Sequence, residues 1–196
     1  MHKGRLEAFT DGVIAIIITI MVLEMKIPAT PSLAGLTAIA PVMGAYALSF
    51  SMVGIFWNNH HHLLQVTEKV DGAVLLANLF LLFWLSLMPF AIRWMDDAHY
   101  MSLPTAAYGF VLTMCGVGYM LLERTIVAAD PANANVAAAV GGDAKAKLSL
   151  VLDLVAMAMA FVRPWIAIVI YVLIALLWII PDRRVEQHLK TTASAK

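Results

Sequence analysis

Residues 5–24 read RLEAFTDGVIAIIITIMVLE, and this stretch decides the class of the protein. Asp11 and Glu24 bracket twelve uncharged residues, from Gly12 to Leu23. A helix rises about 1.5 Å per residue, so the uncharged part covers roughly 18 Å, whereas the hydrocarbon core of a bilayer is about 30 Å thick. If this helix spans a membrane, Asp11 or Glu24 lies near membrane depth, where an ionisable group must be paired or face water. The first helix is therefore a functional candidate.

The composition is that of an integral membrane protein. Hydrophobic residues make up 62 % of the chain and charged residues 13 %, against roughly 45–50 % and 25 % in soluble domains. The formal net charge is zero, which argues against a nucleic-acid partner. No small-residue cleavage site follows an apolar core at the N-terminus, so a removable signal peptide is not expected. The single cysteine, Cys115, lies in an apolar run and is predicted to be buried and inert.

Six apolar segments have about the length that a bilayer demands. We predict spans at about residues 8–27, 36–64, 72–94, 104–122, 148–162 and 164–180. The fifth contains Asp153, which we expect to face solvent or a polar neighbour, and only Arg163 and Pro164 separate it from the sixth. These two segments should therefore form a tight helical hairpin. The prediction is one six-helix domain over residues 1–181, followed by a short polar tail over residues 182–196.

The positions of Lys and Arg predict that both termini lie in the cytoplasm. With the N-terminus inside, the cytoplasmic side holds Lys3, Arg5, Lys69, Arg124, Lys145, Lys147, Arg183, Arg184, Lys190 and Lys196. The outside holds Lys26, Arg93 and Arg163. This excess follows the positive-inside rule and requires an even number of spans. The predicted fold is thus an all-α, multi-pass protein of the plasma membrane, with six transmembrane helices.

Three motifs in the first half of the chain closely resemble the TMEM175 family of potassium-permeable channels. That family opens each six-helix unit with Arg-x-x-x-Phe-Ser-Asp, and this chain has Arg5-x-x-x-Phe9-Thr10-Asp11-Gly12, where Thr10 keeps the hydroxyl. The other two motifs are Phe56-Trp57-x-x-His60-His61, and Asn78-Leu-Phe-Leu-Leu followed by Leu87-Met-Pro89-Phe90. The resemblance covers the second half of the chain only in topology.

One stripe of the first helix is the candidate pore lining. On a wheel of about 100° per residue, a narrow arc holds Gly12, Ile16, Thr19 and Leu23, with Ile20 at its margin. The resemblance implies that Ile16, Thr19, Ile20 and Leu23 line a pore, with Ile16 and Leu23 as hydrophobic rings that gate by dewetting. The residues alone also allow another interpretation, in which Ile and Leu pack on neighbouring helices and Thr19 bonds a carbonyl of its own helix.

A structural network behind the pore helix is also implied by the resemblance. Its predicted members are Arg5, Phe9, Thr10, Asp11, Trp57, His60 and Asn78. A buried Asp11 needs donors, which Arg5, the Trp57 indole or a histidine could supply. Asn78 is expected to make a hydrogen bond between helices. Consecutive histidines on a helix point about 100° apart, so His60–His62 cannot all ligate one ion, and no metal site is predicted.

The sequence allows two roles for Glu24, and it predicts a packing role for three glycines. Glu24 either gathers cations at an outer mouth of the pore or lies at the membrane interface beside Lys26. Gly109, Gly116 and Gly118 are expected to permit close packing between helices.

The predicted function is a homotetrameric cation channel that passes potassium and other monovalent cations. One helix cannot enclose a conduit, so several chains would have to gather around an axis, and the resemblance suggests four. The chain lacks the Thr-Val-Gly-Tyr-Gly filter of the usual potassium channels, so the predicted selectivity over sodium is modest. The expected partners are further copies of the chain and membrane lipid. No cofactor and no enzymatic activity are expected, and the compact single unit suggests a prokaryotic source.

The alternative prediction is a proton-coupled secondary transporter that uses Asp11, Glu24 and His60. Proton-path carboxylates line a continuous polar track, whereas Thr19 is the one polar side chain between Asp11 and Glu24. The residues therefore favour the channel. An intramembrane enzyme would need a nucleophile with a base or a metal motif at membrane depth, and none was found in the sequence.

Overall fold

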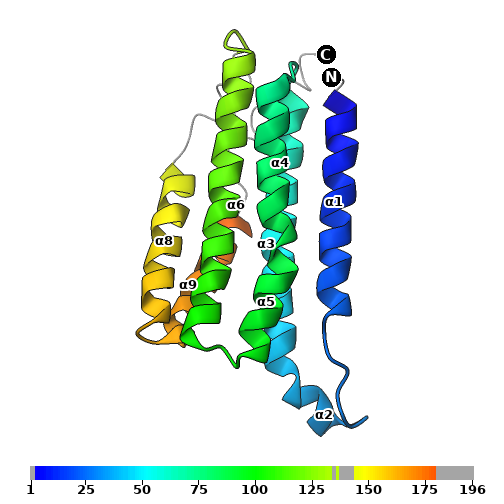
Figure 1. The fold of residues 1–196 in the computed structure, drawn as a ribbon, viewed down its shortest axis with the longest axis vertical. Helices are drawn as coiled ribbons and strands as arrows, with labels where there is room; N and C mark the ends of the chain where they lie inside the picture. The colour runs from blue at the N-terminus through cyan, green and yellow to red at the C-terminus, as the bar shows by residue number, and fades with distance from the viewer. Residues whose placement is uncertain (1–2, 134–135, 137–143, 180–196) are drawn as a thin grey trace.

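The computed structural model describes residues 3–133, 136 and 144–179 (Figure 1). Every regular element in these ranges is a helix, which confirms the prediction of an all-α protein. The helices are α1 (Lys3–Leu23), α2 (Leu33–Ala38), α3 (Ala40–Val66), α4 (Gly72–Ser86), α5 (Met88–Asp97), α6 (Ser102–Ala129), α8 (Ala144–Ala160) and α9 (Pro164–Ile179).

The long helices run alternately up and down in one bundle (Figure 1). In the order of the chain, α4 packs against α6, α6 against α8, and α8 against α9. The first helix stands at one edge of the bundle, where it contacts α3, α4 and α5. One side of α1 therefore faces other helices of the chain, and the other side contacts none of the helices that the structure describes.

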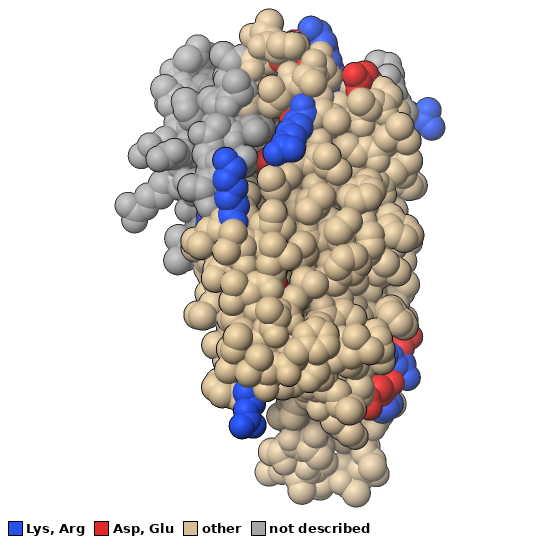
Figure 2. All heavy atoms as spheres, turned by 60° about the vertical axis from the view of Figure 1, so that its left-hand side comes forward, with Lys and Arg blue, Asp and Glu red and all other residues tan. Residues whose placement is uncertain are grey.

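Four segments are long and apolar enough to cross a membrane. They are Lys3–Leu23, Ala40–Val66, Gly72–Asp97 and Ser102–Ala129. The 17 residues of α8 and the 16 residues of α9 extend only about 26 and 24 Å. Four of the six predicted spans are thus confirmed by length and composition, and the total of six stays a prediction. Figure 2 shows charged side chains gathered toward the two ends of the molecule, with a largely uncharged band between them.

Two predicted spans are interrupted in the structure, each next to a proline. The predicted helix over residues 72–94 is two helices, because the chain breaks at Leu87 between α4 and α5. Pro89 lies in the first turn of α5, where its missing N–H leaves no hydrogen bond unmade. The predicted span 36–64 likewise divides at Ile39, with Pro41 in the first turn of α3. Hydropathy runs through both breaks, so it could not locate them.

The predicted ends of other spans were wrong by several residues. The first helix begins at Lys3 and ends at Leu23, whereas hydropathy placed it over residues 8–27. The fourth predicted span ended at Leu122, but α6 continues to Ala129. Charged residues end an apolar count while the helical backbone continues past them. The tight hairpin of the fifth and sixth segments is confirmed, since α8 ends at Ala160 and α9 begins at Pro164. The predicted tail lies outside the described residues.

The core is built from buried residues of every long helix, and glycines allow two of its closest contacts. A Cβ on Gly118 would lie 2.9 Å from the Cα of Leu81, and one on Gly109 would collide with the Tyr171 hydroxyl. The expected close packing is confirmed at both positions. It was wrong for Gly116, where a Cβ would meet nothing within 4 Å. Cys115 is fully buried, as predicted.

Asp153 is buried, so solvent, the first of its two expected surroundings, was wrong; it borders a small cavity that is also lined by polar side chains. The residue is 5 % exposed, and its Oδ1 has no hydrogen-bond partner. Periodicity could not reveal this burial, because α8 has apolar residues on every side.

Candidate functional site

The first helix has two faces of different character. Its buried residues, Leu6, Thr10, Ile14, Ile17 and Met21, face α3, α4 and α5. The predicted stripe lies on the exposed face, where Ile16 is 59 % and Leu23 is 80 % exposed. Thr19 and Ile20 are exposed as well. At about 100° per residue, Thr19 points about 180° away from Thr10. All four stripe residues are therefore turned away from the core of the chain.

Thr19 provides the hydroxyl of this exposed stripe. Its Oγ1 donates to the carbonyl of Ile16 at 2.9 Å, within the same helix. A hydroxyl has one hydrogen but two acceptor lone pairs, so the oxygen remains able to contact a cation or water. Along the axis, Ile16 and Leu23 lie about 5–6 Å to either side of Thr19. Along the stripe, the Thr19 hydroxyl thus lies between the apolar side chains of Ile16 and Leu23.

The opposite face of α1 is held by a chain of buried hydrogen bonds. Asn78 of α4 donates through Nδ2 to Oγ1 of Thr10 at 2.9 Å. The Oδ1 of Asn78 accepts from Nε2 of His60 in α3 at 2.8 Å. All three residues are at most 1 % exposed. Asn78 therefore joins three helices at one point, and its hydrogen-bond partners fix the rotation of α1.

Asp11 lies beside this chain, at the border between the two faces. Trp57 Nε1 donates to Oδ1 of Asp11 at 2.8 Å, and the indole stacks on His61 with centroids 5.8 Å apart. Asp11 is exposed in the single chain and is paired with a donor. Of the three kinds of donor that the sequence suggested for Asp11, the structure shows the Trp57 indole. Within the described ranges Arg5 has no hydrogen bond, and Phe9 is 52 % exposed, so neither joins the others.

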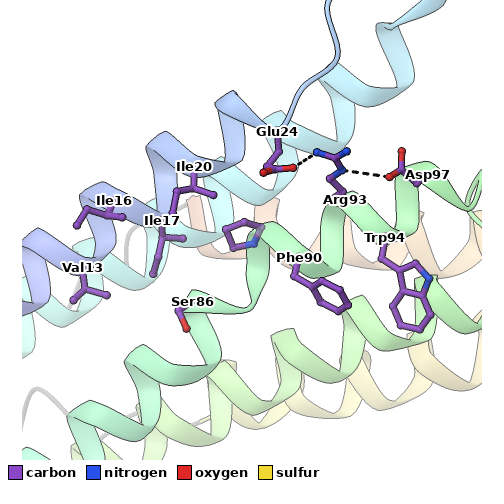
Figure 3. Close-up of a pocket in the computed structure, with 11 residues that line it drawn as sticks. Val13, Ile16, Ile17, Ile20, Glu24, Ser86, Phe90, Arg93, Trp94 and Asp97 are labelled. Atoms are coloured by element: carbon purple, nitrogen blue, oxygen red, sulfur yellow. Dashed lines mark hydrogen bonds and ion pairs between the residues drawn. The ribbon is translucent and has the colours of Figure 1, made fainter.

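The other end of α1 carries charges that pair with α5. Arg93 donates through Nη1 to the Glu24 carboxylate and through Nε to Asp97 Oδ2 at 3.3 Å (Figure 3). Lys26 donates to the other oxygen of Asp97 at 2.5 Å. Glu24 thus has an ion-pair partner that neither interpretation of the sequence contained. Only the i,i+4 spacing of Arg93 and Asp97 gave a sequence signal, because Glu24 is 69 residues away from Arg93.

A groove runs between α1 and α5 next to these charges. It has a volume of about 810 Å³, and Figure 3 shows Ile16 and Ile20 on the α1 side, with Phe90 and Trp94 on the α5 side. The Glu24–Arg93–Asp97 group lines one end of the groove. The exposed stripe of α1 therefore continues sideways into an apolar surface.

Two histidines at the end of α3 contact other side chains of the protein. His61 Nε2 lies 2.9 Å from the Gln65 side chain, and His60 is used by Asn78. In the described part of the chain, no group of three or more His, Cys, Asp or Glu side chains is placed to hold a metal ion.

The turn between α3 and α4 is tied to the end of α6. Lys69 donates to Oδ1 of the buried Asp130 at 2.8 Å, and this hydrogen bond raises the pKa of Lys69 above its ordinary value. The contact joins the C-terminal end of α6 to the α3–α4 turn, at the same end of the bundle at which α1 begins.

The comparisons with known proteins agree with this geometry. A family model described as "Endosomal/lysosomal potassium channel TMEM175" matches residues 5–89, which include every stripe and network residue. A potassium channel of Chryseobacterium sp. (strain P1-3) is 50 % identical over 190 residues, which cover 97 % of this chain and 99 % of that protein. The chain belongs to the TMEM175 family. The predicted family membership is confirmed.

Other TMEM175 relatives are more distant. A potassium channel of Streptomyces collinus (strain DSM 40733 / Tue 365) is 31 % identical over 129 residues, which cover 62 % of this chain and 63 % of that protein. The crystal structure of a lysosomal potassium-selective channel TMEM175 homolog from Chamaesiphon minutus matches with a TM-score of 0.78 and 24 % identity. The match covers 90 % of this chain and 95 % of the other. At this identity the likeness establishes the fold.

Proposed function

We propose that the chain forms a homotetrameric cation channel of the plasma membrane that passes potassium with modest preference over sodium. The observation that carries the proposal is the exposure of Ile16, Thr19, Ile20 and Leu23 on the one face of α1 without intrachain neighbours. The relatives described as potassium channels support the choice of ion.

Oligomerisation follows from the geometry of one helix. A single copy of α1 cannot enclose a conduit, whereas a cyclic assembly brings identical faces together around an axis. Four copies are proposed because the family resemblance suggests that number. Such an assembly would cover the exposed apolar surface of α1 and leave its buried face unchanged.

The stripe provides a physical basis for conduction and gating. Rings of Ile16 and Leu23 would form narrow apolar constrictions, which lose their water and so raise the barrier to an ion. A ring of Thr19 hydroxyls between them would replace part of the hydration shell of the ion. This arrangement selects less sharply than a filter of backbone carbonyls.

The distribution of basic residues supports a cytoplasmic N-terminus. The end of the bundle at which α1 begins carries Lys3, Arg5, Lys69, Arg124, Lys145 and Lys147 among the described residues. The other end carries Lys26, Arg93 and Arg163. The positive-inside rule then places the first of these ends, and with an even number of spans also the C-terminus, in the cytoplasm.

The channel is favoured over a proton-coupled transporter. Asp11 accepts from Trp57, His60 donates to Asn78, and Glu24 pairs with Arg93. These three groups belong to three separate contacts, and the apolar stripe lies between Asp11 and Glu24. They form no continuous polar track.

The test is ion flux through the purified protein in liposomes under a potassium gradient. We expect flux that favours potassium over sodium, a larger and less selective flux for Ile16→Asn, and an altered flux for Leu23→Ala. Leu176→Asn is the matched control, because it changes an exposed apolar residue of α9 and should leave the flux unchanged. Flux absent from an intact oligomer, or indifferent to both α1 substitutions, would contradict the proposal.

A further inference from the structure

A second polar site lies inside the bundle, between α3, α6, α8 and α9. It is a small cavity of about 60 Å³ to which α1 contributes no residue. The polar side chains in its wall are those of Asn59, Tyr119, Ser149, Asp153 and Trp178. Asp153 is the one carboxylate among them, and its Oδ1 lacks a hydrogen-bond partner. The neighbours of this carboxyl group decide what it can bind.

The hydroxyl and indole donors in the cavity wall are already used. Tyr119 donates to the backbone oxygen of Asn59 at 3.1 Å, and Trp178 Nε1 donates to Ser149 Oγ at 2.7 Å. Ser149 in turn donates to the carbonyl of Lys145 at 2.9 Å. Each of these groups has a single polar hydrogen, so none remains for Asp153. The Asn59 amide has two polar hydrogens, but neither is bonded to Asp153 Oδ1, which has no partner. An ionised carboxylate can only accept, whereas a carboxylic acid also donates. Because these donors are already occupied, the cavity favours the protonated form of Asp153 over the carboxylate.

Within the described residues, the helices packed against α8 bring no positive charge to the cavity. Asp153 interacts electrostatically with Tyr108 and Cys115 of α6 and with Tyr171 of α9, all of which are ordinarily uncharged. The α3 side chains in the wall are uncharged. On α6, Glu123 is one turn beyond Tyr119 and would repel a carboxylate.

The nearest bases on α8 itself are further along the helix. Lys145 and Lys147 lie about 12 and 9 Å from Asp153 along the helix axis, and the Lys145 ammonium lies over the Trp178 ring, 4.9 Å from its centroid. A buried carboxylate without a counter-charge is costly, so a cation has to neutralise it.

The size of the cavity and its wall favour a proton over a metal cation. A water needs roughly 10–15 Å³ of such space, so the cavity can hold a few waters. A dehydrated metal cation needs a shell of oxygen ligands, as in the carbonyl rings of potassium filters. Asp153, Asn59 and Ser149 are too few to supply that shell, and most of the wall is apolar.

We propose that Asp153 and this cavity form a proton-binding site, in which the carboxyl group exchanges its proton with the few waters beside it. The proton leaves as hydronium, and the carboxylate that remains is left facing an apolar wall. The site is separate from the exposed face of α1 and does not rest on the proposed conduction of potassium.

The test is infrared spectroscopy of the full-length protein in lipid, which separates the C=O stretch of a carboxylic acid from the bands of a carboxylate. We expect wild type to show an acid band at neutral pH that shifts in deuterium oxide. Asp153→Asn should lose the band. Glu68→Gln, which removes an exposed carboxylate from the α3–α4 turn, should retain it. A missing acid band in wild type, or a band that persists in Asp153→Asn, would overturn the proposal.

Thermal unfolding gives an independent readout. The unfolding midpoint of wild type should fall as the pH is raised from about 4, where the unfolded chain loses this proton, and by more than that of Asp153→Asn, whose amide keeps a donor in the cavity. Failure of Asp153→Asn to fold would count against the proposal, because the amide has the shape of the acid. A midpoint that rises with sodium or potassium in wild type but not in Asp153→Asn, without an acid band, would mean a metal-cation site instead.

Discussion

The two faces of α1 differ in how they are held. The inner face carries Thr10, which Asn78 and His60 connect to two other helices through buried hydrogen bonds. The outer face carries Ile16, Thr19 and Leu23, where the Thr19 hydroxyl bonds a carbonyl of the helix itself. The comparison teaches that the helix is fixed from one side, which leaves the other side available for a function. Inner substitutions should therefore cost stability, and outer substitutions should change conduction.

The largest contrast is expected between Met21→Ala and Leu23→Ala. Met21 is 2 % exposed on the inner face, so its truncation should cost about 2–5 kcal/mol of unfolding free energy. Leu23 is 80 % exposed, and its truncation should change that free energy by about 0.5 kcal/mol or less. Chemical unfolding of the protein in detergent measures both. Equal costs would mean that the outer face is packed like the inner one, and the comparison would fail.

Asn78→Leu should have the next largest effect. It leaves the His60 Nε2 donor and the Thr10 hydroxyl buried without partners, at a cost of about 2–3 kcal/mol. Asn58→Leu is the control, because Asn58 is an exposed amide on α3. Thermal unfolding should separate the two variants. If Asn78→Leu were as stable as Asn58→Leu, the hydrogen-bond chain would not anchor α1.

Two glycines of α6 allow the same comparison on another helix: Gly118 is packed against α4, and Gly116 has open space beside it. Gly118→Ala should cost about 1–3 kcal/mol, because its methyl group would press on the backbone of Leu81. Gly116→Ala should stabilise the helix by up to about 1 kcal/mol, since nothing occupies the space beside it. The midpoints of thermal unfolding should move in opposite directions. A midpoint of Gly118→Ala that stayed at or above that of wild type would show that α4 and α6 are not in close contact at Gly118.

Trp57→Phe should affect stability less than the substitutions at Met21, Asn78 and Gly118. It removes the hydrogen bond to Asp11 at the border of the two faces, at a cost of about 1 kcal/mol. Trp165→Phe changes another exposed indole, which makes no hydrogen bond to any described residue, and should cost less. Unfolding curves of the two variants check this difference. Identical curves would mean that the Asp11–Trp57 bond contributes nothing to the position of α1.

Local sequence signals predicted the helices, the TMEM175 family and the α8–α9 hairpin, because hydropathy and short motifs depend on residues that are near each other in the sequence. They missed contacts between distant residues. The pairing of Glu24 with Arg93 joins helix ends that only the folded bundle brings together. The burial of Asp153 depends on how α8 rotates against α6 and α9, which uniform apolarity on α8 does not encode. The break at Leu87 needed the geometry of Pro89, which hydropathy ignores.

The most direct test of the account compares a cysteine on each face of α1. Thr19→Cys and Met21→Cys are made in a Cys115→Ser background, although the native thiol is buried and should not react. A water-soluble thiol reagent is added to the protein in liposomes while potassium flux is recorded. The account predicts that the reagent blocks flux through Thr19→Cys and leaves Met21→Cys unmodified. If Thr19→Cys reacted no faster than Met21→Cys, or if its modification left the flux unchanged, the outer face of α1 would not line the pore.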